Sequence, residues 1–175
     1  GTHFSKNTDP EAVGYKSLAV NLSDLAAMGA KPKYALLSLA IPKFNEKWIS
    51  KFSTGFFKLI DKYQIELIGG DFCQGHLNIG VTAIGTVPKD KWISSNDIKL
   101  HDDIWVSGEI GNAAKALELT LDKTKNLYSS YNIFITALEF PVPRLVLGMY
   151  LCNIANCSTD LSDSLIQDIQ KIIMK

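Results

Sequence analysis

The segment "NLSDLAAMGAKP", from Asn21 to Pro32, combines a helical pattern of small and apolar residues with one carboxylate, Asp24. Burying a charge in apolar surroundings costs free energy unless the charge is paired or binds a cation. Ser17, Asn21 and Asp24 fall on one side of the predicted helix, at spacings of four and three residues. This narrow polar line is either a strip that faces solvent or, at Asp24, the edge of a metal site.

The sequence around this segment predicts helices that alternate with strands. The first helix extends back to a cap at Thr8 or Asp9 and ends at Gly29. Apolar or alternating runs predict strands at residues 34–42, 65–71, 77–88 and 104–108. Helical spacing predicts further helices at residues 45–64, 112–121 and 143–155, and one that opens near Asp160. The fold class is therefore α+β (mixed α/β), with a domain boundary in the polar stretch after Pro88.

Composition excludes several classes of function. The chain has 46% hydrophobic residues and a formal net charge of zero, so a disordered chain or a nucleic-acid binder is not expected. Arg144 is the only arginine, so phosphate binding must depend on backbone amides, lysines or metal ions. Cys73, Cys152 and Cys157 lack CxxC spacing, which argues against zinc and disulfides and favours a cytoplasmic setting. No apolar run is long enough to span a membrane.

Two further acidic motifs are candidates for a site. "GGD", residues 69–71, ends the strand predicted at residues 65–71 and brings Asp71 to the strand's C-terminal end, where open α/β sheets place ligands and where glycine amides can approach a phosphate. The same tripeptide is also common in turns that bind no ligand. "DLSD" holds Asp160, Ser162 and Asp163, which either cap the last helix or present oxygens to magnesium and amides to phosphate.

The order of the motifs resembles that of the thiamine-monophosphate kinase family, in the superfamily of aminoimidazole-ribonucleotide synthetase and selenophosphate synthetase. The matching segments are "GTHF", "YKSLAVNLSDLAAMGAKP", "LLSLAIP", "LIGGDFCQG", "VTAIGTVP", "DDIWVSGEIGNAA" and "STDLSDSL". They cover the chain except the polar connection near residues 123–140. The resemblance implies a PurM-like N-terminal ATP-binding domain, residues 1–96, with a sheet flanked by helices. Residues 97–175 would begin the PurM-like C-terminal domain.

The resemblance also implies an activity and a set of site residues. A cytoplasmic homodimer would phosphorylate thiamine monophosphate to thiamine diphosphate, using ATP and several Mg²⁺ ions, without a general base. Mg²⁺ would be held by Asp24, Asp71, Asp160 and Asp163. The nucleotide would contact Gly70, Asp71 and Ser162, and the substrate would contact His3, through its phosphate.

The chain departs from the family pattern at three places. Ser95 stands near the position of a nucleotide-binding arginine, and Ser164 replaces a glycine. The triplet Phe72-Cys73-Gln74 replaces Thr-Thr-Arg. Lysines such as Lys91 or Lys99 would then compensate for the missing arginine charge.

The resemblance leaves two alternatives for the function and one expectation about the chain's extent. Instead of this kinase, the protein would be another ATP-using member of the superfamily, or a relative that binds nucleotide without transferring phosphate. Family members also have acidic strands upstream and a second half downstream. We therefore expect an incomplete chain that lacks its first strands and is inactive alone.

Overall fold

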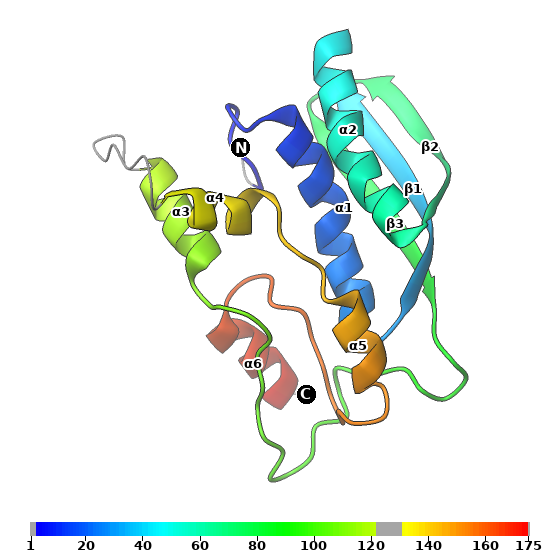
Figure 1. The fold of residues 1–175 in the computed structure, drawn as a ribbon, viewed down its shortest axis with the longest axis vertical. Helices are drawn as coiled ribbons and strands as arrows, with labels where there is room; N and C mark the ends of the chain where they lie inside the picture. The colour runs from blue at the N-terminus through cyan, green and yellow to red at the C-terminus, as the bar shows by residue number, and fades with distance from the viewer. Residues whose placement is uncertain (1–2, 122–130, 175) are drawn as a thin grey trace.

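The computed structural model describes residues 3–121 and 131–174. Its elements follow one another as α1 (Pro10–Ala27), β1 (Lys31–Ile41), α2 (Glu46–Tyr63), β2 (Glu66–Gln74), β3 (Asn78–Thr86), α3 (Asn112–Leu121), α4 (Tyr131–Glu139), α5 (Leu145–Leu151) and α6 (Leu165–Ile173). Helix α1 lies in the middle, with α2 and the sheet on one side, α3 and α4 on the other, and α5 beside its C-terminal end (Figure 1). The predicted α+β class is confirmed.

The sheet has three strands in the order β2-β1-β3. Strand β1 pairs in parallel with β2 and antiparallel with β3, so it has a neighbour on both sides. On the face of β1 that the helices cover, Ala35, Leu39 and Ile41 are buried, whereas Tyr34 and Ser38 are exposed. The parallel pair is connected through α2 in a β-α-β crossover.

The first helix begins and ends where the sequence predicts. Asp9 is the N-cap, and its carboxylate accepts a hydrogen bond of 2.9 Å from the backbone amide of Glu11. Pro10 occupies the first turn, where its missing N–H costs nothing. Gly29 follows the helix with φ of +73°, a conformation that side chains other than glycine rarely adopt.

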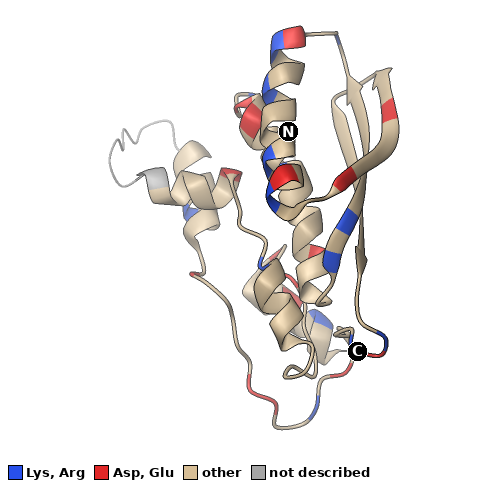
Figure 2. Ribbon diagram, turned by 45° about the vertical axis from the view of Figure 1, so that its right-hand side comes forward, with Lys and Arg blue, Asp and Glu red and all other residues tan. Residues whose placement is uncertain are grey.

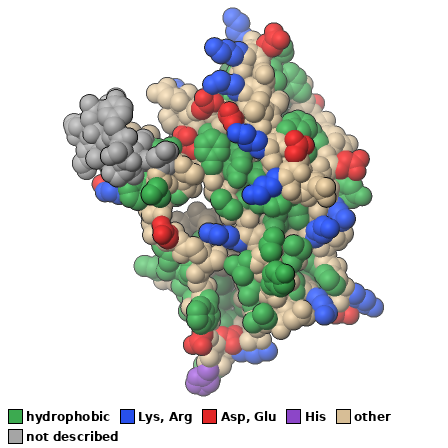
Figure 3. Space-filling view, in the orientation of Figure 1, with side chains coloured by type: hydrophobic (Ala, Val, Ile, Leu, Met, Phe, Trp, Pro, Cys, Tyr) green, Lys and Arg blue, Asp and Glu red, His purple; other side chains and the backbone are tan. Residues whose placement is uncertain are grey.

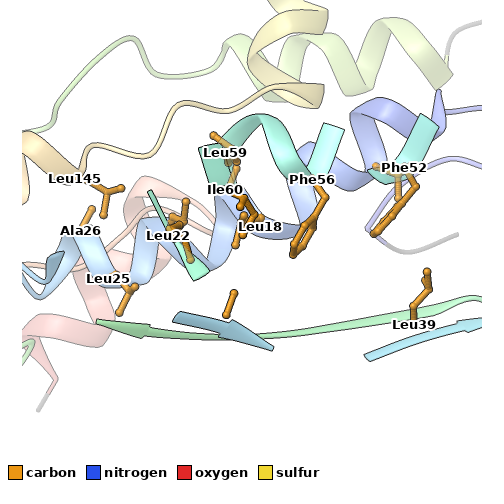
Figure 4. Packing of buried hydrophobic residues seen from close by; sticks show 14 of the residues in the cluster. Leu18, Leu22, Leu25, Ala26, Leu39, Phe52, Phe56, Leu59, Ile60 and Leu145 are labelled. Atoms are coloured by element: carbon orange, nitrogen blue, oxygen red, sulfur yellow. The ribbon is translucent and has the colours of Figure 1, made fainter. Parts of the chain in front are cut away.

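The core lies between α1, α2 and the sheet (Figure 4). Helix α2 contributes aromatic residues at the predicted four-residue spacing, and Phe52 and Phe56 are 1% and 0% exposed. Leu18 and Leu22 of α1 are fully buried against them. Each such side chain contributes about 1.5 to 3 kcal/mol through burial. This packing holds α1, and with it Asp24, in one position.

Two predictions of local structure are wrong. Residues 104–108 form no strand, and Trp105 is 88% exposed, because this segment pairs with no neighbour among the described residues. Without a neighbouring strand, the backbone N–H and C=O groups of an apolar run have no pairing partner, so the extended conformation is not stabilised. The expected polar connection contains helix α4, while its residues 122–130 lie outside the described part of the chain.

The polar stretch after Pro88 forms backbone hydrogen bonds with the segment that precedes Asp160. Ser94 forms a parallel bridge with Cys157, and the amide of Ser158 donates to the carbonyl of Ser94 at 3.2 Å. The predicted boundary is therefore in contact with the second half of the chain. Helices α3 and α4 pack on each other, α4 also contacts α1, and a hollow opens below them (Figure 3).

No helix in residues 3–121 and 131–174 is long and apolar enough to cross a membrane.

Replacing Asp9 with alanine should lower the free energy of unfolding by about 1 kcal/mol, mainly through loss of the N-cap. The hydrogen bonds from Lys51 and Glu11 lower the pKa of Asp9 below 3.8. This stabilisation is therefore present above pH 3.8 and disappears as the pH falls through the lowered value. Urea unfolding at pH 7 and below pH 3 measures both effects.

Lys51→Met is the control for the Asp9 variant. It removes the exposed ion pair with Asp9, whose nitrogen–oxygen distance is 2.8 Å, and leaves the cap intact. Exposed ion pairs contribute less than caps, so this variant should lose less stability. A larger loss in Lys51→Met than in Asp9→Ala would contradict the assignment to the cap.

Candidate functional site

The structure places the carboxyl groups of Asp24 and Asp160 within hydrogen-bonding reach of each other. Partial burial raises the pKa of Asp24, although the hydrogen bond with Asp160 opposes this shift. Burial, followed by the nearby charges of Asp24 and Asp168, raises the pKa of Asp160. Two carboxylates from distant parts of the chain thus repel each other in a partly desolvated place. A divalent cation would neutralise both.

Asp24 differs from the two other members of the polar line on α1. The Ser17 hydroxyl donates to the carbonyl of Val13 at 2.7 Å, and the Asn21 amide donates to the carbonyl of Ser17 at 2.8 Å. Both side chains are therefore satisfied by their own helix. Asp24 is exposed, as the interpretation of the line as a solvent-facing strip predicts, and in addition its carboxyl group reaches that of Asp160.

The loop that carries Asp160 ends at a helix cap formed by Ser164. The Ser164 hydroxyl accepts a hydrogen bond of 3.2 Å from the amide of Gln167, and α6 begins at the next residue. The interpretation of Asp160 and Asp163 as a capping pair is therefore wrong. The cap also gives the serine a structural role at the position where the family has glycine, because serine is a preferred N-cap.

Asp163 is bound by a lysine. Its carboxylate accepts a hydrogen bond of 2.5 Å from Lys171, which also contacts Asp168. These two carboxylates raise the pKa of Lys171. The side chain of Ser162 is exposed, and its backbone amide donates to Asp168.

Asp71 does not join the pair. It lies within β2, opposite Ser38 of β1, and its side chain is exposed. The prediction that the strand ends at Asp71 is wrong, because pairing with β1 continues to Gln74. Helix α1 packs on β3 and β1, so β2 is the strand farther from Asp24. Within the described ranges, no three His, Cys, Asp or Glu side chains gather around one ion position.

Gly70 has a structural reason to be glycine. Its φ is +152°, and a Cβ at this position would overlap the backbone of Leu37 on the neighbouring strand. Close pairing of β1 and β2 therefore excludes any side chain here. The predicted contact with nucleotide stays a prediction.

His3 lies away from the Asp24–Asp160 pair. Its side chain is exposed, and its carbonyl accepts a hydrogen bond of 3.4 Å from Lys16 on α1. Lys16 precedes Asp24 by eight residues, a rise of about 12 Å along the helix. The structure therefore does not bring His3 into contact with the acidic pair.

The lysines expected to replace the family's arginine bind asparagines. Lys91 donates to the amide oxygen of Asn153 at 3.1 Å, and Lys99 donates to that of Asn156 at 2.7 Å. Ser95 donates to Asn96 at 3.2 Å. These contacts hold the loops together. Basic and acidic residues are interspersed along the ribbon in this view (Figure 2).

The third departure from the family pattern, the triplet at residues 72–74, lines a small open hollow. Phe72, Cys73 and Gln74 meet Ile41 and Phe44 around a volume of about 140 Å³ at the ends of β1 and β2. The Gln74 amide donates to the carbonyl of Pro42 at 3.3 Å. The three residues thus make this end of the sheet more apolar than the family's Thr-Thr-Arg.

Sequence reasoning missed Asp168. This residue is 2% exposed although it carries a charge. Its spacing of three residues before Lys171 on a helix is a signal of an ion pair. No pattern in the neighbouring sequence predicts that the Asp168 side chain is buried.

Comparison with family models and curated proteins finds one consistent set of relatives. The model of the AIR synthase related protein, N-terminal domain, matches residues 1–87. Thiamine-monophosphate kinases from Buchnera aphidicola (subsp. Acyrthosiphon pisum), Haemophilus influenzae and Escherichia coli K12 are 44%, 42% and 37% identical over 99%, 98% and 99% of this chain. The chain covers 54%, 52% and 54% of these proteins, about half the length of the curated relatives it matches.

Solved structures agree with this likeness. The thiamine-monophosphate kinase from Stenotrophomonas maltophilia K279a superposes with a TM-score of 0.93 at 43% identity, covering 98% of this chain and 56% of that one. AaThiL complexed with AMPPCP and TMP superposes with a TM-score of 0.93 at 30% identity, covering 99% of this chain and 56% of that one.

Proposed function

Because the chain belongs to the thiamine-monophosphate kinase family, we propose that the protein transfers a phosphoryl group from ATP to thiamine monophosphate and forms thiamine diphosphate. Support comes from relatives that bear this name and match nearly the whole chain. A neighbour of the same fold is described in complex with AMPPCP and TMP.

The observation that carries this proposal is the contact between Asp24 and Asp160. Two carboxylates are the hard oxygen ligands that Mg²⁺ prefers, and their mutual repulsion is a cost that a cation removes. The donor set therefore fits magnesium. A bound magnesium would supply positive charge against the phosphates, which this chain needs because Arg144 is its only arginine.

The remaining site residues have proposed roles that follow the family pattern. Asp71 and Asp163 would hold further magnesium ions, and Asp71 with Gly70 and Ser162 would contact the nucleotide. His3 would bind the substrate phosphate. In this scheme the residues act by positioning and by electrostatic stabilisation, and none acts as a general base.

The proposal extends to organisation and location. Residues 1–96 would form the ATP-binding domain and residues 97–175 the start of the second domain. The protein would act as a homodimer in the cytoplasm, where cysteines remain reduced, as the three free cysteines allow. Light scattering of the full-length protein tests the dimer.

The direct test supplies the full-length protein with thiamine monophosphate, Mg²⁺ and ATP labelled at its terminal phosphate. Labelled thiamine diphosphate should accumulate, and a chelator should abolish it. Unphosphorylated thiamine is the control acceptor and should give no thiamine diphosphate. Label transfer to another acceptor would instead favour a different ATP-using member of the superfamily.

The departures at Ser95 and Phe72-Cys73-Gln74, together with the Lys171 contact of Asp163, favour one second candidate. This is a relative that binds nucleotide without transferring phosphate. Calorimetry separates the two, because such a relative would bind ATP with Mg²⁺ yet give no product with any acceptor.

A further inference from the structure

Asp168 is the one charged residue that is buried in residues 3–121 and 131–174, at 2% exposure. It lies on the inner side of α6, in a helix that otherwise carries its charges on exposed positions. A buried carboxylate is costly unless several donors satisfy it. Its partners therefore indicate what it stabilises.

Three donors meet the Asp168 carboxylate. One oxygen accepts from the backbone amides of Ser162 and Asp163, at 3.0 and 3.2 Å. The other accepts from Lys171 at 2.9 Å. Burial alone would raise the pKa of Asp168, but these hydrogen bonds outweigh it and lower the pKa. The carboxylate is therefore ionised and anchored at both oxygens.

The two amides belong to the loop that carries Asp160. This loop makes a tight approach to α6, and Ser164 caps the helix immediately after it. Bonds to successive amides fix the path of the backbone two and three residues beyond Asp160. Anchoring the loop sets where the Asp160 carboxyl group stands beside Asp24.

We propose that Asp168 is a positioning residue, which holds the loop of residues 160–163 so that Asp160 and Asp24 together bind a divalent cation. This inference rests on the proposed function, because it assumes that the acidic pair is a metal site. Asp168 itself does not contact the cation. It acts through the backbone, as the outer partners of metal ligands do.

The test measures Mn²⁺ binding to the full-length protein by electron paramagnetic resonance, without nucleotide. Asp168→Ala should weaken binding roughly 10-fold or more, the range found for such outer partners. Asp168→Asn keeps an oxygen that accepts from both amides, so it should recover most of the affinity. A loss due only to the missing charge would be equal in both variants.

Lys171→Met is the matched control. It removes the ion pairs with Asp163 and Asp168 and should lower thermal stability, but it leaves both amide hydrogen bonds in place. It also removes a cation near Asp160, so Mn²⁺ affinity should stay the same or increase. A merely structural role of the cluster would instead weaken binding in Lys171→Met in proportion to lost stability.

The outcomes separate this inference from the function on which it rests. If the parent protein binds Mn²⁺, Asp24→Asn abolishes binding and Asp168→Ala binds as the parent does, the positioning role is overturned. If Asp168→Ala fails to fold, Asp168→Asn decides the question. Parent-like Mn²⁺ binding and a parent-like Mg²⁺ requirement in Asp168→Asn support the role of the amide anchor. Equal losses of Mn²⁺ affinity in Asp168→Asn and Lys171→Met overturn it. If Asp24→Asn leaves parent binding unchanged, the metal site itself fails.

Discussion

Replacing Asp24 with asparagine should lower kcat of the proposed kinase about 100-fold, while the metal-free protein becomes no less stable. A magnesium ligand supplies several kcal/mol of charge stabilisation during phosphoryl transfer. Loss of about 3 kcal/mol corresponds to a factor of about 100 in rate. In the absence of metal, however, the same change removes repulsion between Asp24 and Asp160. Activity and stability therefore change in opposite directions.

The pH dependence gives the sign of the stability effect. The folded-state pKa values of Asp24 and Asp160 are raised above 3.8, so the native pair binds protons more tightly than the unfolded chain. Its favourable contribution is full below pH 3.8 and is lost as the pH rises through the raised values. Asp24→Asn should flatten this decline, which thermal unfolding in a chelator between pH 4 and 8 measures.

Asp61→Asn is the control for the Asp24 variant. Asp61 is an exposed carboxylate on α2, outside the acidic pair. Its replacement removes the same charge and should leave both kcat and the pH profile unchanged. The metal assignment of Asp24 would be contradicted by a variant that keeps the parent's kcat at saturating Mg²⁺.

The parts of the fold that sequence predicts are those with local causes. The ends of α1 depend on Asp9 and Gly29, which act within one or two residues of the helix. The buried face of α2 depends on the spacing of Phe52 and Phe56, which follows from helix geometry. Such features need no knowledge of the rest of the chain.

The errors have non-local causes. Strand β2 continues through Asp71 because Ser38 of β1 lies opposite, and nothing in "GGD" itself indicates this partner. Residues 104–108 have strand composition, yet no neighbour pairs with them among the described elements. Strand formation depends on a partner elsewhere in the sequence, so composition alone misplaces it.

In the candidate site, too, local features are predictable from sequence and non-local contacts are not. Asp24 attracts attention as a carboxylate in a small, apolar helix, but no periodicity connects it with Asp160. Only the family resemblance placed both in one site, and the structure brings these two together. Neither the sequence pattern nor the family resemblance predicted a role for Asp168, because its role depends on burial and on hydrogen bonds from backbone amides.

Replacing Gly55 with alanine should destabilise the protein by about 2 kcal/mol, measured by urea unfolding. In an exposed helix the same substitution stabilises by about 1 kcal/mol, because alanine is the better helix former. Here a Cβ at Gly55 would overlap the carbonyl oxygen of Glu11 on α1, and one at Gly14 would overlap that of Phe52. The backbones of α1 and α2 are in direct contact, so a methyl group forces the helices apart and disturbs the core.

Because Gly14 and Gly55 lie at the same crossing, their alanine variants should be non-additive. The first methyl group separates the helices, and the second then meets a gap already opened, so the double variant should lose less than the sum. Gly80→Ala is the control: its Cβ would lie 3.7 Å from the Cβ of Ser38, an ordinary contact, and its stability should change by less than about 0.5 kcal/mol. A stabilised Gly55→Ala would mean that helix propensity outweighs the crossing. The position of Asp24 on α1 would then depend less on α2 than the close contact of the two backbones implies.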